Sequence, residues 1–107
     1  MELTREGIQQ AVEAAERRFG SGNDARALRL GMYWAQECRM NDLPKPDDDQ
    51  IRTAAALYCE LWPPEPPASA KDVRYWLRIG LGKHARTESV AMGLPALHAP
   101  LKKPDLP

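Results

Sequence analysis

The side chains best suited to binding chemistry lie in the segment 69–86, SAKDVRYWLRIGLGKHAR, where five basic residues accompany one aspartate. Arginine can hold a carboxylate or a phosphate through two parallel hydrogen bonds, and arginine and tyrosine are enriched where proteins bind partners. Arg74 and Arg78 are one helical turn apart, so on a helix they share a face beside Tyr75. The predicted binding residues are Lys71, Arg74, Tyr75, Arg78, Lys83 and Arg86.

Three interpretations of this basic segment stay open on the sequence alone. The arginines can cover the core with their stems and pair with the acidic N-terminal half. They can instead contact a protein partner, or the phosphates and bases of a nucleic acid. The net charge is zero, with seven basic and ten acidic residues in 1–50 against eight and five in 51–107. Nucleic-acid-binding domains usually carry a basic excess overall, so a protein partner is favoured over nucleic acid.

The sequence contains none of the motifs that identify common catalytic or cofactor sites, such as a P-loop, a glycine-rich dinucleotide motif or H-E-x-x-H. His84 and His98 are isolated in a basic segment and a proline-rich tail. Cys38 and Cys59 lack CxxC spacing and lie in apolar helical patterns, which indicates two reduced, mostly buried thiols. We therefore expect a protein that is not an enzyme and has no cofactor and no metal.

Three consecutive carboxylates, Asp47 to Asp49, suggest a site for a hard cation such as Mg²⁺. Consecutive side chains at a helix start point in different directions, however, so they do not form one coordination cage. Asp47 and Gln50 fit a capping box, and the other two aspartates place negative charge where the helix dipole favours it. The triplet is predicted to be structural.

The elements that would position these residues are helices, because apolar residues recur at helical spacing and nowhere alternate clearly as in a strand. Thr4 is a suitable N-cap and Gly20 a suitable C-terminal stop for a first helix. A second helix is expected over 24–40, capped by Asn23. It is apolar over much of its circumference, which predicts a central position, and small residues such as Gly31 would admit a neighbouring backbone.

A third helix begins at the Asp47 capping box and stops at Pro63, because proline cannot donate a backbone hydrogen bond. Four of the five residues in 63–67 are prolines, and we interpret this segment as a rigid spacer and not as a ligand for another domain. Trp62, at the helix end against the prolines, is expected to be partly exposed or stacked on Pro63.

A fourth helix follows Ser69, which forms a capping box with Asp72, and is expected to end at about residues 79–81 because Gly80 and Gly82 weaken it. A basic loop would follow, and then a short fifth helix over 88–92. The residues predicted to face inward are Val73, Trp76, Leu77, Gly80 and Leu81, whereas Tyr75 and Ile79 are predicted to project away from them.

The sequence thus predicts an all-α, single-domain bundle of four main helices over residues 1–94, with or without a short fifth, and an irregular proline-rich tail over 95–107. Sequential helices are expected to pack as neighbours, mostly antiparallel. No apolar run approaches the ~18 residues of a membrane span, and the N-terminus has no apolar core of a signal peptide. We expect a cytoplasmic protein.

The function expected from this pattern is that of a small, non-enzymatic helical module that binds a protein partner and modulates it. An inhibitor encoded by a phage or plasmid and a regulatory subunit both fit the profile. The alternative is a nucleic-acid-binding regulator that uses the basic segment 71–86. A homodimer is compatible with either function, because the helix over 24–40 is apolar on more faces than a small monomer easily covers.

Overall fold

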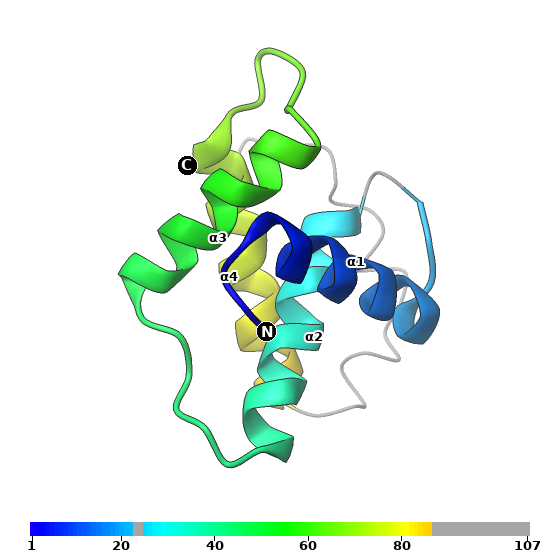
Figure 1. Ribbon diagram of the computed structural model, residues 1–107, viewed down its shortest axis with the longest axis vertical. Helices are drawn as coiled ribbons and strands as arrows, with labels where there is room; N and C mark the ends of the chain where they lie inside the picture. Colours follow the sequence, from blue (N-terminus) through cyan, green and yellow to red (C-terminus); the bar gives the residue numbers. More distant parts are fainter. Residues whose placement is uncertain (23–24, 87–107) are drawn as a thin grey trace.

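The computed structural model of the chain describes residues 1–22 and 25–86, with side chains described as far as residue 82. Over these residues the protein has four helices and no strand, as the sequence predicts (Figure 1). The helices are α1 (Arg5–Phe19), α2 (Arg26–Met40), α3 (Asp48–Leu61) and α4 (Ala70–Arg86). The Asn23 cap, the short helix over 88–92 and the tail over 95–107 lie outside the described residues. None of the described helices is long and apolar enough to cross a membrane.

The four helices follow the cyclic order α1–α2–α4–α3, in which each helix packs against two others. The most extensive contact joins α2 and α4, and these two helices run in the same general direction (Figure 1). Helices α2 and α3 follow each other in sequence but make at most marginal contact. The expectation that sequential helices pack as antiparallel neighbours is therefore wrong for this pair, because α3 packs against α1 and α4 and the side of α2 is covered by α4 instead.

Two glycines allow the backbones of α2 and α4 to touch. A Cβ atom added to Gly31 would overlap the carbonyl oxygen of Leu77, and one added to Gly80 would overlap the carbonyl oxygen of Leu28. The Cα atom of each glycine also lies close to where the Cβ of the other would be. Gly31 thus has the role expected for it, and Gly80 is its counterpart on α4.

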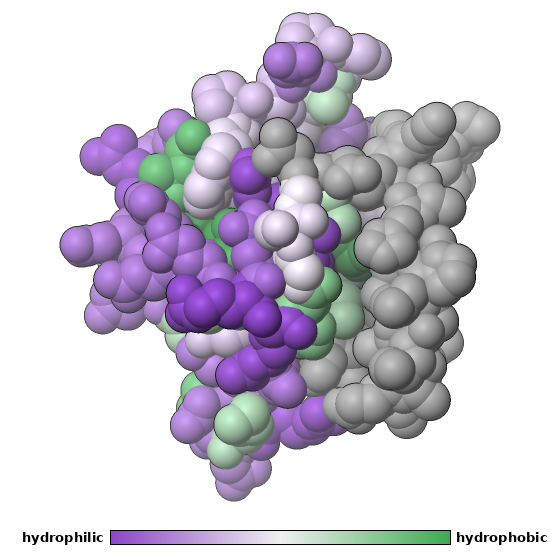
Figure 2. Space-filling model, turned by 90° about the vertical axis from the view of Figure 1, so that its right-hand side faces the viewer, coloured by the Kyte–Doolittle hydropathy of each residue, from purple (hydrophilic) through white to green (hydrophobic). Residues whose placement is uncertain are grey.

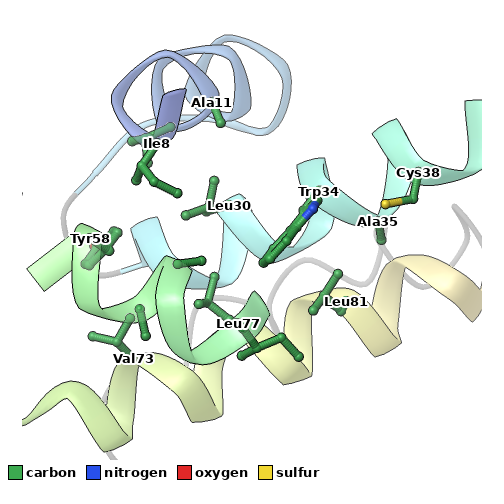
Figure 3. Close-up of a cluster of buried hydrophobic side chains, with 14 residues drawn as sticks. Ile8, Ala11, Leu30, Trp34, Ala35, Cys38, Tyr58, Val73, Leu77 and Leu81 are labelled. Carbon is green, nitrogen blue, oxygen red and sulfur yellow. The ribbon is translucent and has the colours of Figure 1, made fainter. Parts of the chain in front are cut away.

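Buried side chains from all four helices meet in one main cluster, to which Figure 3 shows α1 contributing Ile8 and Ala11 from above. Leu30 and Leu77, from α2 and α4, have no exposed surface at all, and neither does Ile8. Burial of a side chain of this size stabilises the fold by about 1.5–3 kcal/mol. Trp34 is also buried, as predicted.

A smaller cluster beside the main one corrects two predictions. Besides the apolar stripe that faces the main cluster, α2 has a second apolar stripe on which Leu28 and Met32 are buried. Half-buried Trp76 and Ile79 of α4 pack against these two residues together with Phe19. Ile79 is therefore not on an outward face, and Trp76 is at the edge of the core instead of inside it. The close approach at the two glycines turns this side of α4 towards α2, so both stripes of α2 are covered.

The starts of α1, α3 and α4 confirm the predicted caps, whereas α2 begins at Arg26, two residues later than expected, with Ala25 at the N-cap position and no side-chain cap. The hydroxyl of Thr4 accepts a hydrogen bond from the backbone N–H of Gly7 at 3.0 Å. The Asp47–Gln50 capping box is complete, with bonds of 2.8 and 2.9 Å. At the start of α4, the backbone N–H of Ser69 donates to Asp72 at 2.9 Å.

The end of α4 differs from the prediction. The helix continues through Gly80 and Gly82 to Arg86, so the segment expected to be a basic loop is the last part of a helix. A helical glycine costs about 1 kcal/mol relative to alanine. Packing against α2 offsets this cost at Gly80. Helix propensity, which depends on the local sequence alone, could not predict this contact with another helix.

Candidate interaction surface

The described members of the predicted binding set lie on the sides of α4 that the core leaves uncovered. The helix buries Val73, Leu77 and Leu81, which are spaced by one turn each. Among the predicted binding residues, Lys71 and Arg78 are exposed, whereas Arg74 and Tyr75 are half-buried. Lys83 and Arg86 belong to the last part of α4, where the structure describes the backbone but not the side chains.

Arg78 connects α4 to the first turn of α3. Its Nη2 atom lies 3.2 Å from Oδ1 of Asp48, and the two side chains are 45% and 73% exposed. An ion pair this open to water contributes between about 0 and 1 kcal/mol to stability, so it can be exchanged for a partner's charges at little cost. Arg78 therefore pairs with the acidic N-terminal half of the chain and remains accessible from outside.

Arg74 of α4 lies near enough to Cys59 of α3 for its charge to act on the thiol. Burial raises the pKa of the Cys59 thiol above its ordinary value, and the positive charge of Arg74 opposes this effect. Burial also raises the pKa of Cys38. Both cysteines are free, Cys38 buried and Cys59 half-buried, so both are protonated thiols at neutral pH.

Tyr75 is held in place by its neighbour. The ring centroids of Tyr75 and Trp76 are 5.0 Å apart in an edge-to-face arrangement. Aromatic pairs of this kind contribute about 0.5–1.5 kcal/mol beyond the burial of their area. Tyr75 thus presents a half-buried, orientated ring on the same exposed part of α4 as the two arginines.

Each aspartate of the Asp47–Asp49 triplet has its own partner. Asp47 caps α3, Asp48 pairs with Arg78, and Asp49 lies 3.3 Å from Arg52. Within the part of the chain that the structure describes, no three His, Cys, Asp or Glu residues are grouped so that they could hold a metal ion. The triplet instead places negative charge at the border of the basic side of α4. We use the name α3–α4 surface for Asp48, Lys71, Arg74, Tyr75 and Arg78.

A groove lies where the start of α2, the end of α3, the proline segment and the start of α4 meet, and no sequence pattern indicated it as a whole. It has a volume of about 610 Å³, and its lining includes Tyr58, Trp62, Pro64 and Trp76. Trp62 beside the prolines was the one sequence feature that pointed to this place. The other lining residues come from distant parts of the chain and could not be grouped from the sequence. We call this hollow the aromatic groove.

The remaining described surface is mostly polar. Figure 2 shows a face on which hydrophilic side chains predominate and apolar ones appear in small separate areas. Of the large apolar side chains that the structure describes, Met40 and Leu43 are the exposed ones, at 70% and 56%. The apolar faces of α2 that suggested a homodimer are covered by α1 and α4, so the homodimer stays a prediction without support from this helix.

No known protein family, curated protein or solved structure shows significant similarity to this chain.

Proposed function

We propose that this chain is a small, non-enzymatic helical module that binds a partner protein through the α3–α4 surface and modulates it, as an inhibitor or as a regulatory subunit in the cytoplasm. The observation that carries the proposal is the exposed Arg78–Asp48 pair, which joins basic and acidic residues of two helices beside an orientated tyrosine. Surfaces of mixed charge with arginine and tyrosine anchors are typical of protein–protein contacts.

The charge arrangement favours a protein over a nucleic acid. The basic residues of α4 are bordered by the acidic first turn of α3, and one of them is already partly neutralised by Asp48. A phosphate backbone that approached Arg78 would also approach these carboxylates and be repelled by them. A protein partner can place its own acidic and basic groups opposite both signs.

The test uses a photo-crosslinking amino acid at position 75 of the full chain, in cells that express the protein. We expect one discrete protein adduct from this position and none from the same amino acid at the exposed position 40. Arg74→Glu combined with Arg78→Glu should abolish the adduct, because reversed charges repel the acidic groups that the arginines hold. Arg39→Glu combined with Lys45→Glu changes the net charge equally at exposed positions on α2 and the following loop, and should leave the adduct unchanged.

An adduct that persists in the Arg74/Arg78 variant, with its helical circular dichroism intact, would exclude the α3–α4 surface as the binding site. Titration with duplex DNA, single-stranded DNA and RNA at low and physiological salt tests the alternative. Each phosphate contact with duplex DNA steepens the fall of log affinity with log salt by about 0.9. Tight binding with a slope of several such contacts would replace the protein partner by a nucleic acid.

A further inference from the structure

The aromatic groove has a floor that is fixed before any ligand arrives. Tyr58 is 7% exposed, and its ring centroid lies 5.1 Å from that of half-buried Trp62. The guanidinium of Arg26 lies 4.7 Å from the centroid of the Trp62 ring and is held by Glu16, whose Oε2 is 3.4 Å from Nε. These contacts orient the indole, so little side-chain freedom remains to be lost on binding.

The walls of the groove present further flat, rigid surfaces. Pro63 and Pro64 follow Trp62 directly, and their rings limit the movement of the backbone on this side. Half-buried Trp76 faces the groove from α4 and is supported by the edge-to-face contact with Tyr75. The volume, about 610 Å³, lies within the range of roughly 300–1,000 Å³ in which proteins hold ligands.

The charges around the groove favour a cation. Its lining holds two carboxylates, Glu65 and Asp72, and one basic residue, Arg26, which is already paired with Glu16. The side chain of Glu65 is exposed, and its carboxylate makes no hydrogen bond or ion pair with the described part of the chain. Its carboxylate is therefore free to meet a positive charge on a ligand.

We propose that the aromatic groove binds an extended, proline-containing segment of a partner protein that carries an arginine or lysine. Proline-rich segments keep a preformed extended helix that loses little entropy on binding, and proteins recognise it by stacking its rings on aromatic side chains. The two tryptophans supply those side chains above the buried ring of Tyr58, and the exposed carboxylate of Glu65 supplies the site for the basic residue, whereas Asp72 is already bonded to the backbone N–H of Ser69. This surface shares no residue with the α3–α4 surface, which it meets at the Tyr75–Trp76 pair, and the inference does not depend on the proposed function.

The test is a nuclear magnetic resonance titration of the full chain with a blocked synthetic peptide of prolines and leucine that contains one arginine. The indole N–H signals of the three tryptophans report the site, because Trp62 and Trp76 line the groove whereas Trp34 is 5% exposed in the core. We expect saturable shifts of the Trp62 and Trp76 signals and an unchanged Trp34 signal.

Two control peptides separate the contributions of charge and conformation. The peptide with glutamate in place of arginine should bind more weakly, as should the peptide with alanine in place of the prolines. No saturable shift with the arginine peptide, equal shifts of all three indoles, or equally tight binding of the glutamate peptide would each overturn the proposal.

A pair of protein variants locates the cation site. Glu65→Lys should weaken binding of the arginine peptide by about fivefold, the effect of losing one exposed ion pair. Glu13→Lys, an equal change of charge at an exposed position on α1, should leave the affinity unchanged. Equal affinities of the two variants would show that the arginine is not held at Glu65.

Trp76→Leu tests the aromatic wall while it keeps an apolar side chain against the cluster of Leu28 and Met32. We expect the peptide to bind about tenfold more weakly or worse, as when an interface loses an aromatic anchor. If this variant does not fold, the Glu65→Lys result decides the proposal. Because the experiment leaves Arg74 and Arg78 intact, its failure would not affect the proposed function, and failure of the crosslinking test would not affect the groove.

Discussion

Among single residues, the Asp47–Asp49 triplet shows how three neighbours of one type take different roles. One caps the helix, one bridges to α4, and one pairs within its own helix. Cap and dipole arguments predicted the role of Asp47 and the favourable charge of the other two. They did not predict the Arg78–Asp48 pair, because that contact joins residues 30 positions apart and depends on how α3 meets α4.

The triplet yields a prediction about stability. Asp47→Ala removes a side chain that accepts a hydrogen bond from Gln50 N–H, and it should lower the free energy of unfolding by about 0.5–2 kcal/mol. Asp49→Ala removes only an exposed pair with Arg52, and it should change stability by about 0.5 kcal/mol or less. Urea denaturation followed by circular dichroism compares the two variants. Equal losses of stability in the two variants would mean that the Asp47 cap contributes no more to stability than the exposed Asp49–Arg52 pair.

Among the elements, the contact between α2 and α4 determines how the bundle is built. The starts of α1, α3 and α4 follow from local caps at Thr4, Asp47 and Ser69, which the sequence displays. The end of α4 could not be predicted in this way, because Gly80 is unfavourable in an isolated helix and is favoured only where another backbone touches it. The same contact explains why Ile79 is half-buried.

The three glycines of α2 and α4 give a matched test of that contact. Gly80→Ala and Gly31→Ala should each destabilise the protein by about 1–3 kcal/mol, because the added methyl group overlaps a carbonyl oxygen of the other helix. Gly82→Ala adds the same methyl group in open space and should stabilise the protein by about 0.5–1 kcal/mol. Thermal melts compare all three variants. Stabilisation by Gly80→Ala would show that the helices are not in backbone contact.

For the whole molecule, the sequence predicted a helical bundle but not its arrangement, and part of one surface but not the second. The basic side of α4 could be predicted because its residues follow one another at helical spacing. The aromatic groove could not, because Arg26, Tyr58, Glu65 and Trp76 come together only after α2, α3 and α4 have packed. The two surfaces lie on different sides of α4, so one helix would position both partners.

The extensive contact between α2 and α4, which are far apart in the sequence, also has a consequence for how the protein folds during synthesis. As the chain leaves the ribosome, α2 emerges long before α4, its most extensive partner. Until α4 follows, Leu28, Leu30 and Gly31 have no surface to cover them on that side.

We expect that a chain released after residue 66 is digested rapidly by trypsin, whereas the full chain resists through residues 26–61. Equal resistance would show that α1 to α3 fold alone. The bundle can therefore fold only after α4 has been synthesised, and a chaperone could bind the exposed apolar face of α2 before then.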